Sequence, residues 1–119
     1  MGSEELKRRT KSFALRVMRL VEALPKTATG RAVGHQLVRS GTSVGANYRA
    51  ACRGRSKAEF AAKVGTVAEE ADESCFWMEL IIEGHLLPAE QVQPLLDEAN
   101  ELTAIFTAST KTAKTGGKP

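Results

Sequence analysis

The sequence predicts an all-α protein, an antiparallel up-down-up-down four-helix bundle. The 119 residues contain four prolines and few aromatic residues, and 42% of them are hydrophobic, which is ordinary for one domain with a real core. Apolar residues recur at steps of three and four along four successive segments. Short connections between long helices make consecutive helices antiparallel. We therefore expect a bundle over residues 1–111 and a flexible C-terminal tail over residues 112–119.

The first segment is an amphipathic helix that Pro25 ends. Ser3 is expected to cap its start, and Glu4 and Glu5 are favourably placed in its first turn. Its apolar stripe consists of Leu6, Phe13, Val17, Leu20, Val21 and Leu24.

The second segment runs from about residue 30 to residue 53. Its buried stripe is expected to hold Leu37, Val44, Tyr48 and Cys52. Three glycines, Gly34, Gly41 and Gly45, lie near that stripe, and each costs about 1 kcal/mol against alanine inside a helix. Either another helix packs closely against them or the helix simply tolerates them, and we favour close packing.

The third segment has the clearest boundary in the chain. Gly54 closes the second helix, and Ser56 with Glu59 forms a capping box at the start of the third. This helix is expected to continue to about Glu83. Its core face is expected to carry Phe60, Val64, Val67, Ala71, Cys75, Met78 and Ile82.

The fourth segment follows Gly84 and Pro88. Pro94 is expected to mark its first turn or a kink within it, and the tail is expected to fray from Lys111. The apolar positions in helical register are Val92, Leu95, Leu96, Ala99, Leu102, Ile105 and Phe106.

Charges are sorted along the chain. Residues 26–63 contain eight basic residues and one acid, whereas residues 64–101 contain ten acids and no lysine or arginine. One half of the chain should therefore attract the other, within a subunit or between subunits. A basic and an acidic face on one molecule favour a head-to-tail contact that closes as a homo-oligomeric ring.

Two basic clusters are candidates for binding the phosphate backbone of RNA or DNA. Such contacts release counterions without reading the base sequence, and a ring would multiply them by avidity. The alternative is that these residues neutralise the acidic helices. The first cluster is Lys7, Arg8, Arg9 and Lys11, and the second is Arg49, Arg53, Arg55 and Lys57.

The turn near residue 55 predicts which residues of the second and third helices lie at the same height. Position numbers that sum to about 110 should be level, so Arg39 lies near Ala71 and Asn47 near Lys63. We predict that Arg39 contacts Glu69 or Glu73 and fixes the register of the two helices. A solvated surface pair is the alternative.

Phe76 and Trp77 are consecutive in a helix and point about 100° apart, so they cannot both face one core. One of them is a candidate for a subunit interface. A wide apolar stripe inside the monomer is the competing interpretation.

No motif predicts catalysis or a cofactor. The Glu-x-x-His step of di-iron bundles, a Gly-x-Ser-x-Gly elbow and a phosphate-binding glycine loop are all absent from the sequence. We therefore expect no catalytic residues, no metal site and no cofactor. No long apolar stretch or signal core is present, so we expect a cytoplasmic protein with no membrane partner.

Three linked motifs resemble a bacterial four-helix-bundle family first noticed as products of intervening sequences in 23S ribosomal RNA genes. They are the block from Arg39 to Arg49, the turn from Gly54 to Phe60, and the run from Glu73 to Trp77. Related proteins include the accessory variability protein of diversity-generating retroelements, a pentameric ring that binds nucleic acid and a reverse transcriptase. The residues that match the family pattern are Arg39, Ser43, Asn47, Glu69, Glu73 and Trp77.

This resemblance implies a bundle that assembles as a homopentamer and has no known catalytic activity. The matching residues would be a structural signature. Many relatives carry a glutamate where this chain has Ala50-Ala51-Cys52, so contacts of that acid are not expected here. We expect a non-enzymatic oligomeric scaffold or accessory protein that binds nucleic acid, with a reverse transcriptase or another protein as a further partner. The alternative is a protein-binding adaptor whose charges serve only self-assembly.

Overall fold

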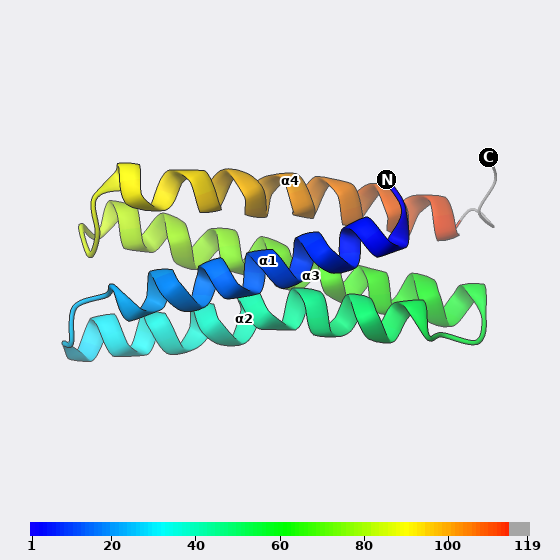
Figure 1. Cartoon of the computed structure of the whole chain (residues 1–119), viewed down its shortest axis with the longest axis horizontal. Helices are drawn as coiled ribbons and strands as arrows, with labels where there is room; N and C mark the ends of the chain where they lie inside the picture. The colour runs from blue at the N-terminus through cyan, green and yellow to red at the C-terminus, as the bar shows by residue number, and fades with distance from the viewer. Residues whose placement is uncertain (115–119) are drawn as a thin grey trace.

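Four long helices form an antiparallel up-down-up-down bundle in the computed structural model, which describes residues 1–114 (Figure 1). Their bounds are Ser3–Glu22 (α1), Ala28–Cys52 (α2), Lys57–Glu83 (α3) and Ala89–Lys114 (α4). The molecule is a rod with extents of 46 × 20 × 20 Å. The predicted fold class is therefore confirmed, and none of these helices combines the length and apolarity needed to cross a membrane.

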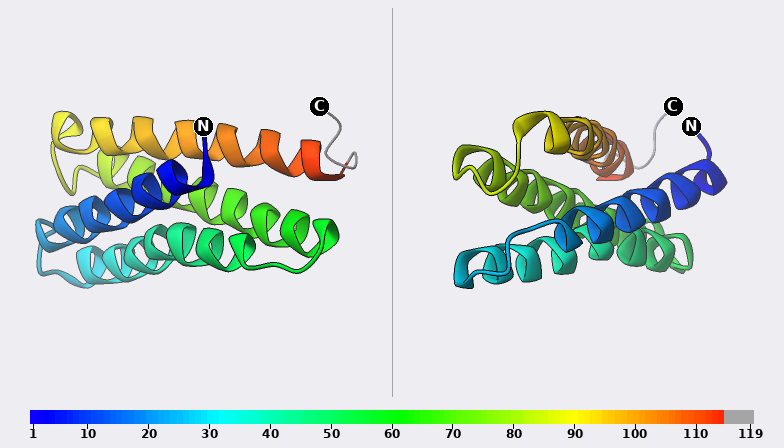
Figure 2. Two further views of the ribbon diagram at one scale, coloured as in Figure 1. Left: turned by 45° about the vertical axis from the view of Figure 1, so that its right-hand side comes forward. Right: turned by 60° about the vertical axis from the view of Figure 1, so that its left-hand side comes forward.

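The helices do not pack equally on one another. α2 packs along α1 and α3, and α3 packs along α4, whereas α1 and α4 make sparse contacts. Figure 2 shows why: α1 leans, so that its N-terminal end approaches α4 while its C-terminal end lies over α2. α1 and α3 occupy diagonal corners of the bundle, and their backbones do not approach each other.

α1 buries the predicted residues Leu6, Phe13, Val17 and Leu20 and ends before Pro25, as expected. The predicted Ser3 cap is wrong. The helix begins one residue earlier than expected, so Gly2 occupies the capping position and Ser3 lies inside the first turn, where its side chain cannot act as the cap.

α2 begins two residues before the predicted start, because the side chain of Thr27 accepts a hydrogen bond from the Gly30 amide at 3.0 Å. Its glycines lie against α1. A Cβ on Gly41 would come within 2.8 Å of Val17, and one on Gly45 would lie 3.4 Å from backbone atoms of Thr10. Close packing against another helix is therefore confirmed.

α3 begins at the predicted capping box. The Ser56 hydroxyl accepts a hydrogen bond from the Glu59 amide at 3.1 Å, and the Glu59 carboxylate accepts one from the Arg55 amide at 2.5 Å. The buried face differs from the prediction at both ends: Phe60 and Ile82 are only half-buried, whereas Ala61 and Ile81 are buried. Burial at Ile81 follows a seven-residue repeat with Val67 and Ser74, the 3.5-residue period of helices that coil around one another, whereas a 3.6-residue period from Val64 would reach residue 82.

α4 agrees with the second of the two predicted placements of Pro94, inside the helix, and differs from the prediction at its C-terminal end. The helix begins at Ala89, so Pro94 lies inside it and not in its first turn, and it leaves the Glu90 carbonyl without an intrahelical donor. At the other end α4 continues to Lys114, so residues 112–114 are helical and not tail. The rest of the predicted tail, 115–119, lies outside the described residues.

The core runs the length of the rod and takes residues from all four helices. Its largest buried side chains include Phe13, Leu37, Met78 and Phe106. Tyr48 of α2 and Phe106 of α4 meet across the diagonal, with ring centroids 5.2 Å apart. The outer faces of the helices are left to carry the charges.

Candidate nucleic-acid and assembly surfaces

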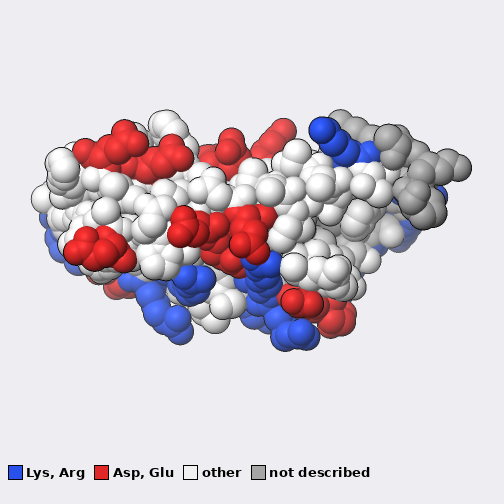
Figure 3. All heavy atoms as spheres, turned by 90° about the horizontal axis from the view of Figure 1, so that it is seen from above, with Lys and Arg blue, Asp and Glu red and all other residues white. Residues whose placement is uncertain are grey.

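Folding turns the sorting of charge along the chain into a sorting by face. On the face seen in Figure 3, acidic residues lie over the middle and the upper edge, and a group of lysines and arginines lies along the lower edge, with a few acidic residues beside it. α1 and α2 supply the basic side because they carry most of the lysines and arginines, and α3 and α4 supply the acidic side. The molecule therefore has a strong charge asymmetry across its short dimension.

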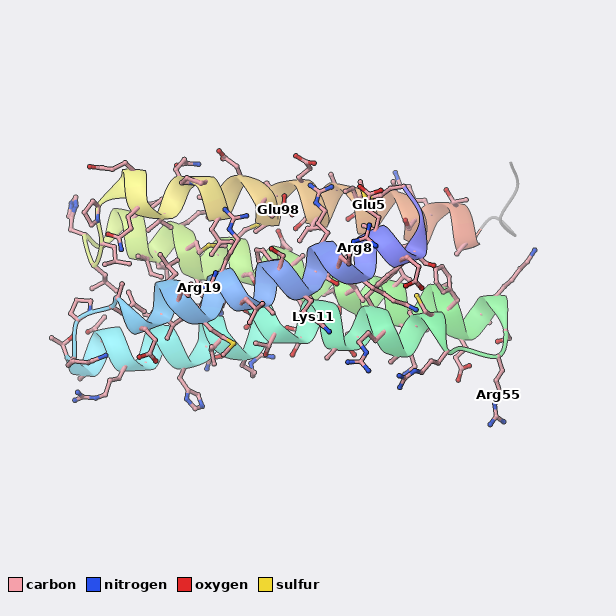
Figure 4. All side chains as sticks on the ribbon, viewed as in Figure 1. Glu5, Arg8, Lys11, Arg19, Arg55 and Glu98 are labelled. Carbon is pink, nitrogen blue, oxygen red and sulfur yellow. The ribbon has the colours of Figure 1, made fainter. Side chains whose placement is uncertain are left out.

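The two predicted basic clusters partly merge into one surface. Lys7 and Lys11 of α1 and Arg49 of α2 line a shared hollow of about 160 Å³. Its other lining residues are small: Ala14, Thr42, Gly45 and Ala46. Figure 4 shows Lys11 on the side of α1 that lies next to α2. Arg53, one turn beyond Arg49, is also exposed. We call Lys7, Lys11, Arg49 and Arg53 the α1–α2 basic surface.

Most of this surface is available to a ligand. Lys11, Arg49 and Arg53 form no ion pair with any of residues 1–114. Lys7 pairs with Glu4 at 3.2 Å, but this pair lies three residues apart on an exposed helix face. Such pairs contribute well under about 1 kcal/mol, so a phosphate could displace the glutamate.

Arg9 is engaged inside the bundle. Its guanidinium donates to both carboxylate oxygens of Glu98, from Nε at 2.7 Å and from Nη2 at 2.9 Å, and Nη2 also pairs with Glu101. The Arg9 and Glu98 side chains are only 20% and 17% exposed. Hydrogen bonds to Glu98 and Glu101 raise the pKa of Arg9. Arg9 therefore ties α1 to α4 and is not available to a nucleic acid, unlike its exposed neighbour Arg8.

The rest of the second cluster lies where α2 turns into α3: Arg55 is in the turn and Lys57 is the first residue of α3. Arg55 and Lys57 line a separate hollow of about 490 Å³ with Phe60 and residues of α4. Figure 4 shows Arg55 extending from the turn at this end of the rod, away from the helices. The sequence cluster is thus divided between a helix face and a turn.

Sequence analysis missed two arginines of α1. Arg16 and Arg19 line a hollow of about 260 Å³ against Gln91, Pro94 and Leu95 of α4. Neither arginine forms an ion pair within the described part of the chain. Arg16 lies seven residues after Arg9, and Arg19 lies eleven residues after Arg8. Because steps of seven and eleven return to nearly the same face of a helix, this spacing could have identified both arginines as neighbours of the first basic cluster.

The predicted contact of Arg39 is present. Its guanidinium pairs with Glu73 of α3 and lies 3.3 Å from Glu70, while Glu69, the other predicted carboxylate, makes no ion pair in the described residues. The Trp77 indole N–H also donates to Glu73, at 3.0 Å. These hydrogen bonds, first from Trp77 and then from Arg39, lower the pKa of Glu73.

Ser43 and Asn47, the other predicted register residues, bond within α2. The Ser43 hydroxyl donates to the Arg39 carbonyl at 2.7 Å, and the Asn47 amide donates to the Ser43 carbonyl at 2.9 Å. The buried polar contact between α2 and α3 is instead Ser40 with Ser74, whose hydroxyl oxygens are 2.9 Å apart. Sequence analysis did not identify this pair, because small polar residues in a helix are usually solvated or bonded to their own backbone.

Protonating Glu73 should cost stability, and the sign follows from its lowered pKa. The contribution of Glu73 is complete above the unfolded-state pKa of about 4.3 and is lost as the pH falls through the lower folded-state pKa. We expect Glu73→Gln to lower the thermal midpoint at neutral pH, and the difference from wild type to vanish in strong acid. The measurement is thermal unfolding against pH, followed by the fluorescence of Trp77, the single tryptophan.

Glu69→Gln is the matched control for this prediction, since Glu69 is exposed one turn away and has no cationic partner among residues 1–114. Its difference from wild type should stay small at every pH. Indistinguishable pH profiles for the two variants would contradict the proposed role of the Arg39–Glu73–Trp77 contact.

The two predicted interface candidates behave differently. Phe76 is 51% exposed, whereas Trp77 is half-buried and packs against the core. The rings meet edge to face with centroids 5.1 Å apart. Three further large apolar side chains of the helices are exposed, Leu15 and Met18 on α1 and Leu80 on α3. They escaped sequence analysis because they lie off the buried stripes.

The described residues contain no group of three or more His, Cys, Asp or Glu side chains placed to hold a metal ion. Burial raises the pKa of the Cys75 thiol, which makes it a poor nucleophile at neutral pH. The geometry therefore offers binding surfaces, and the chemistry of those surfaces is electrostatic and apolar.

Comparison with known proteins supports the fold over nearly the whole chain. The sequence model of the family described as 23S rRNA-intervening sequence protein matches residues 4–108. A crystal structure of a protein of unknown function from the S23 ribosomal protein family of Bacteroides thetaiotaomicron is similar, with 30% sequence identity and a TM-score of 0.85. The similarity covers 94% of this chain and 100% of that one. No curated protein matches the chain.

Proposed function

Because the chain belongs to the 23S rRNA-intervening sequence protein family, whose matched region spans nearly the whole bundle, we propose that it is a non-enzymatic, homo-oligomeric scaffold that binds nucleic acid. The α1–α2 basic surface carries this proposal. It brings Lys7 and Lys11 of α1 and Arg49 of α2, far apart in sequence, onto one hollow lined by small residues. A phosphate can approach such a surface closely.

The surface supports recognition of the backbone and not of the bases. Lysine and arginine bind phosphate oxygens and release counterions, which gives affinity that falls steeply with salt. Among the described residues, α1 and α2 offer this surface no exposed aromatic residue on which a base could stack, since the large exposed apolar side chains of α1 are Leu15 and Met18 and Tyr48 of α2 is buried. RNA and DNA should therefore bind with similar, weakly sequence-specific affinity. Repetition of the surface in an oligomer would add avidity.

Charge reversal at Arg49 and Arg53 tests the proposal. We expect Arg49→Glu/Arg53→Glu to weaken binding of labelled RNA and DNA at least about tenfold and to reduce the slope of log affinity against log salt by about two, because each arginine accounts for about one phosphate contact. The measurement is fluorescence anisotropy at two salt concentrations.

Lys26→Glu/Arg31→Glu is the matched control, because it makes the same change of net charge on two exposed residues at the far end of the rod, one just before α2 and one in its first turns. It should retain most of the wild-type affinity. Equal losses in both variants would mean that net charge and not this surface decides binding. Loss of binding in Arg55→Glu alone would place the site at the α2–α3 turn and contradict the proposal.

The second candidate function is a protein-binding adaptor whose charges serve only self-assembly. The observation that favours it is Arg9, whose charge is neutralised by α4 and not left for a ligand. Negligible binding of RNA and DNA by the wild-type protein at low salt would favour this adaptor.

A further inference from the structure

The exposed face of α1 carries an apolar pair within a basic surround. Leu15 and Met18 are 46% and 47% exposed although both are large apolar residues. Lys11 lies four residues before Leu15 and Arg19 four residues after it, so both flank Leu15 on the helix surface. We call Lys11, Leu15, Met18 and Arg19 the α1 outer patch. Its acidic neighbour, Glu22, lies at the C-terminal end, one turn beyond Met18.

The exposed face of α3 carries the opposite combination. Phe76 is 51% exposed and Leu80 is 37% exposed. Asp72 and Glu79 lie four residues before and three residues after Phe76, and Glu83 lies three residues after Leu80. These residues form the α3 outer patch: Asp72, Phe76, Glu79, Leu80 and Glu83.

The two patches of one chain cannot contact each other. α1 and α3 occupy diagonal corners of the bundle, and their outer faces point in opposite directions (Figure 2). None of the charged residues of either patch forms an ion pair with the other described residues. Each patch therefore exposes to solvent an apolar area surrounded by charged side chains that have no counter-charge.

We propose that the α1 outer patch of one protomer binds the α3 outer patch of a second copy of this chain. This inference rests on the proposed oligomeric scaffold and assigns the contact that builds it. The patches are similar in length, about 12 Å and about 16 Å at 1.5 Å per residue. The apolar pairs can bury each other while lysine and arginine face carboxylates, which gives the contact a defined partner.

Like-with-like contacts are disfavoured by the same charges. Two α1 outer patches would bring Lys11 and Arg19 of both copies together, and two α3 outer patches would bring their carboxylates together. Pairing α1 with α3 is heterologous, so an open chain of protomers keeps one free patch of each kind, at its two ends, until the assembly closes. The α1–α2 basic surface overlaps the contact only at Lys11, which leaves Arg49 and Arg53 free for a nucleic acid.

A mixing experiment tests this contact. Leu15→Glu places an acid in the α1 outer patch, and Phe76→Lys places a base in the α3 outer patch. Each change is at an exposed position, so both variants should keep the circular dichroism spectrum of the wild type. We expect each variant alone to sediment as a monomer at concentrations where the wild type is oligomeric. An equimolar mixture should associate again, because each variant supplies the patch that the other has lost.

Ala104→Glu and Ala108→Lys are the matched controls, since they place the same charges on exposed positions of α4. Both should assemble as the wild type does. An oligomeric wild type whose mass neither patch variant changes, or folded monomeric variants that stay monomeric when mixed, would overturn the assigned contact but leave the scaffold proposal standing. A monomeric wild type would overturn both, whatever its affinity for RNA.

Discussion

Replacing Phe106 with alanine is expected to lower the free energy of unfolding by about 3–5 kcal/mol. Phe106 is 1% exposed and packs its ring against Tyr48, so it joins the diagonal helices α2 and α4, whose backbones do not approach each other. Truncation removes apolar burial and leaves a cavity that rigid neighbouring helices cannot fill. The loss is a large part of the 5–15 kcal/mol that stabilises a typical domain.

Urea unfolding measures the loss at Phe106. Phe106→Leu is the graded control, because it keeps most of the buried volume and should cost less than half as much. A cost below about 1 kcal/mol for Phe106→Ala would mean that the diagonal contact contributes little to the core.

Arg9→Met is expected to cost about 2 kcal/mol of stability. This cost lies between the contribution of an exposed ion pair, at most about 1 kcal/mol, and the cost of disrupting a fully buried one, about 3–5 kcal/mol. Arg9 and Glu98 are mostly buried and joined by two hydrogen bonds, at 2.7 and 2.9 Å. Removing Arg9 leaves the Glu98 carboxylate partly buried without a counter-charge. Since α1 and α4 make few other contacts, we expect faster hydrogen exchange in α1 as well.

The double variant Arg9→Met/Glu98→Met separates the two contributions. Because an apolar pair of similar volume often replaces a buried ion pair at little cost, the double variant should recover most of the stability. Arg53→Met is the control, since it removes an exposed arginine without an ion pair in the described residues and should change stability by no more than about 0.5 kcal/mol. A double variant as unstable as Arg9→Met would contradict the role given to the stranded carboxylate.

The helices and their order follow from local signals. The periodic stripe of α1 and the capping box of Ser56 and Glu59 depend on residues three or four positions apart, and both are present in the structure. The Arg39–Glu73 contact could also be predicted, because a short turn fixes which residues of two consecutive helices are level. The errors at Ser3 and at the C-terminal end of α4 concern helix ends, where a shift of one to three residues changes which residue caps the helix or belongs to the tail.

Which side chains form the binding surfaces could not be predicted without the tertiary structure. Nothing near Arg9 in the sequence distinguishes it from Arg8, yet Arg9 pairs with Glu98, 89 positions away, while Arg8 is exposed. The lean of α1 decides this outcome, because it brings one end of the helix to α4 and leaves the other end apart (Figure 2). Likewise, Leu15 and Phe76 could not be identified as exposed until the burial of each helix face was known.

The sequence by itself determined that this protein is a helical bundle with a basic half and an acidic half, because helical period, capping and charge are properties of neighbouring residues. Only the tertiary structure decided which charges are neutralised and which face outward. Those outcomes depend on the angles at which whole helices pack, and packing angles arise from contacts between residues that are distant in the chain.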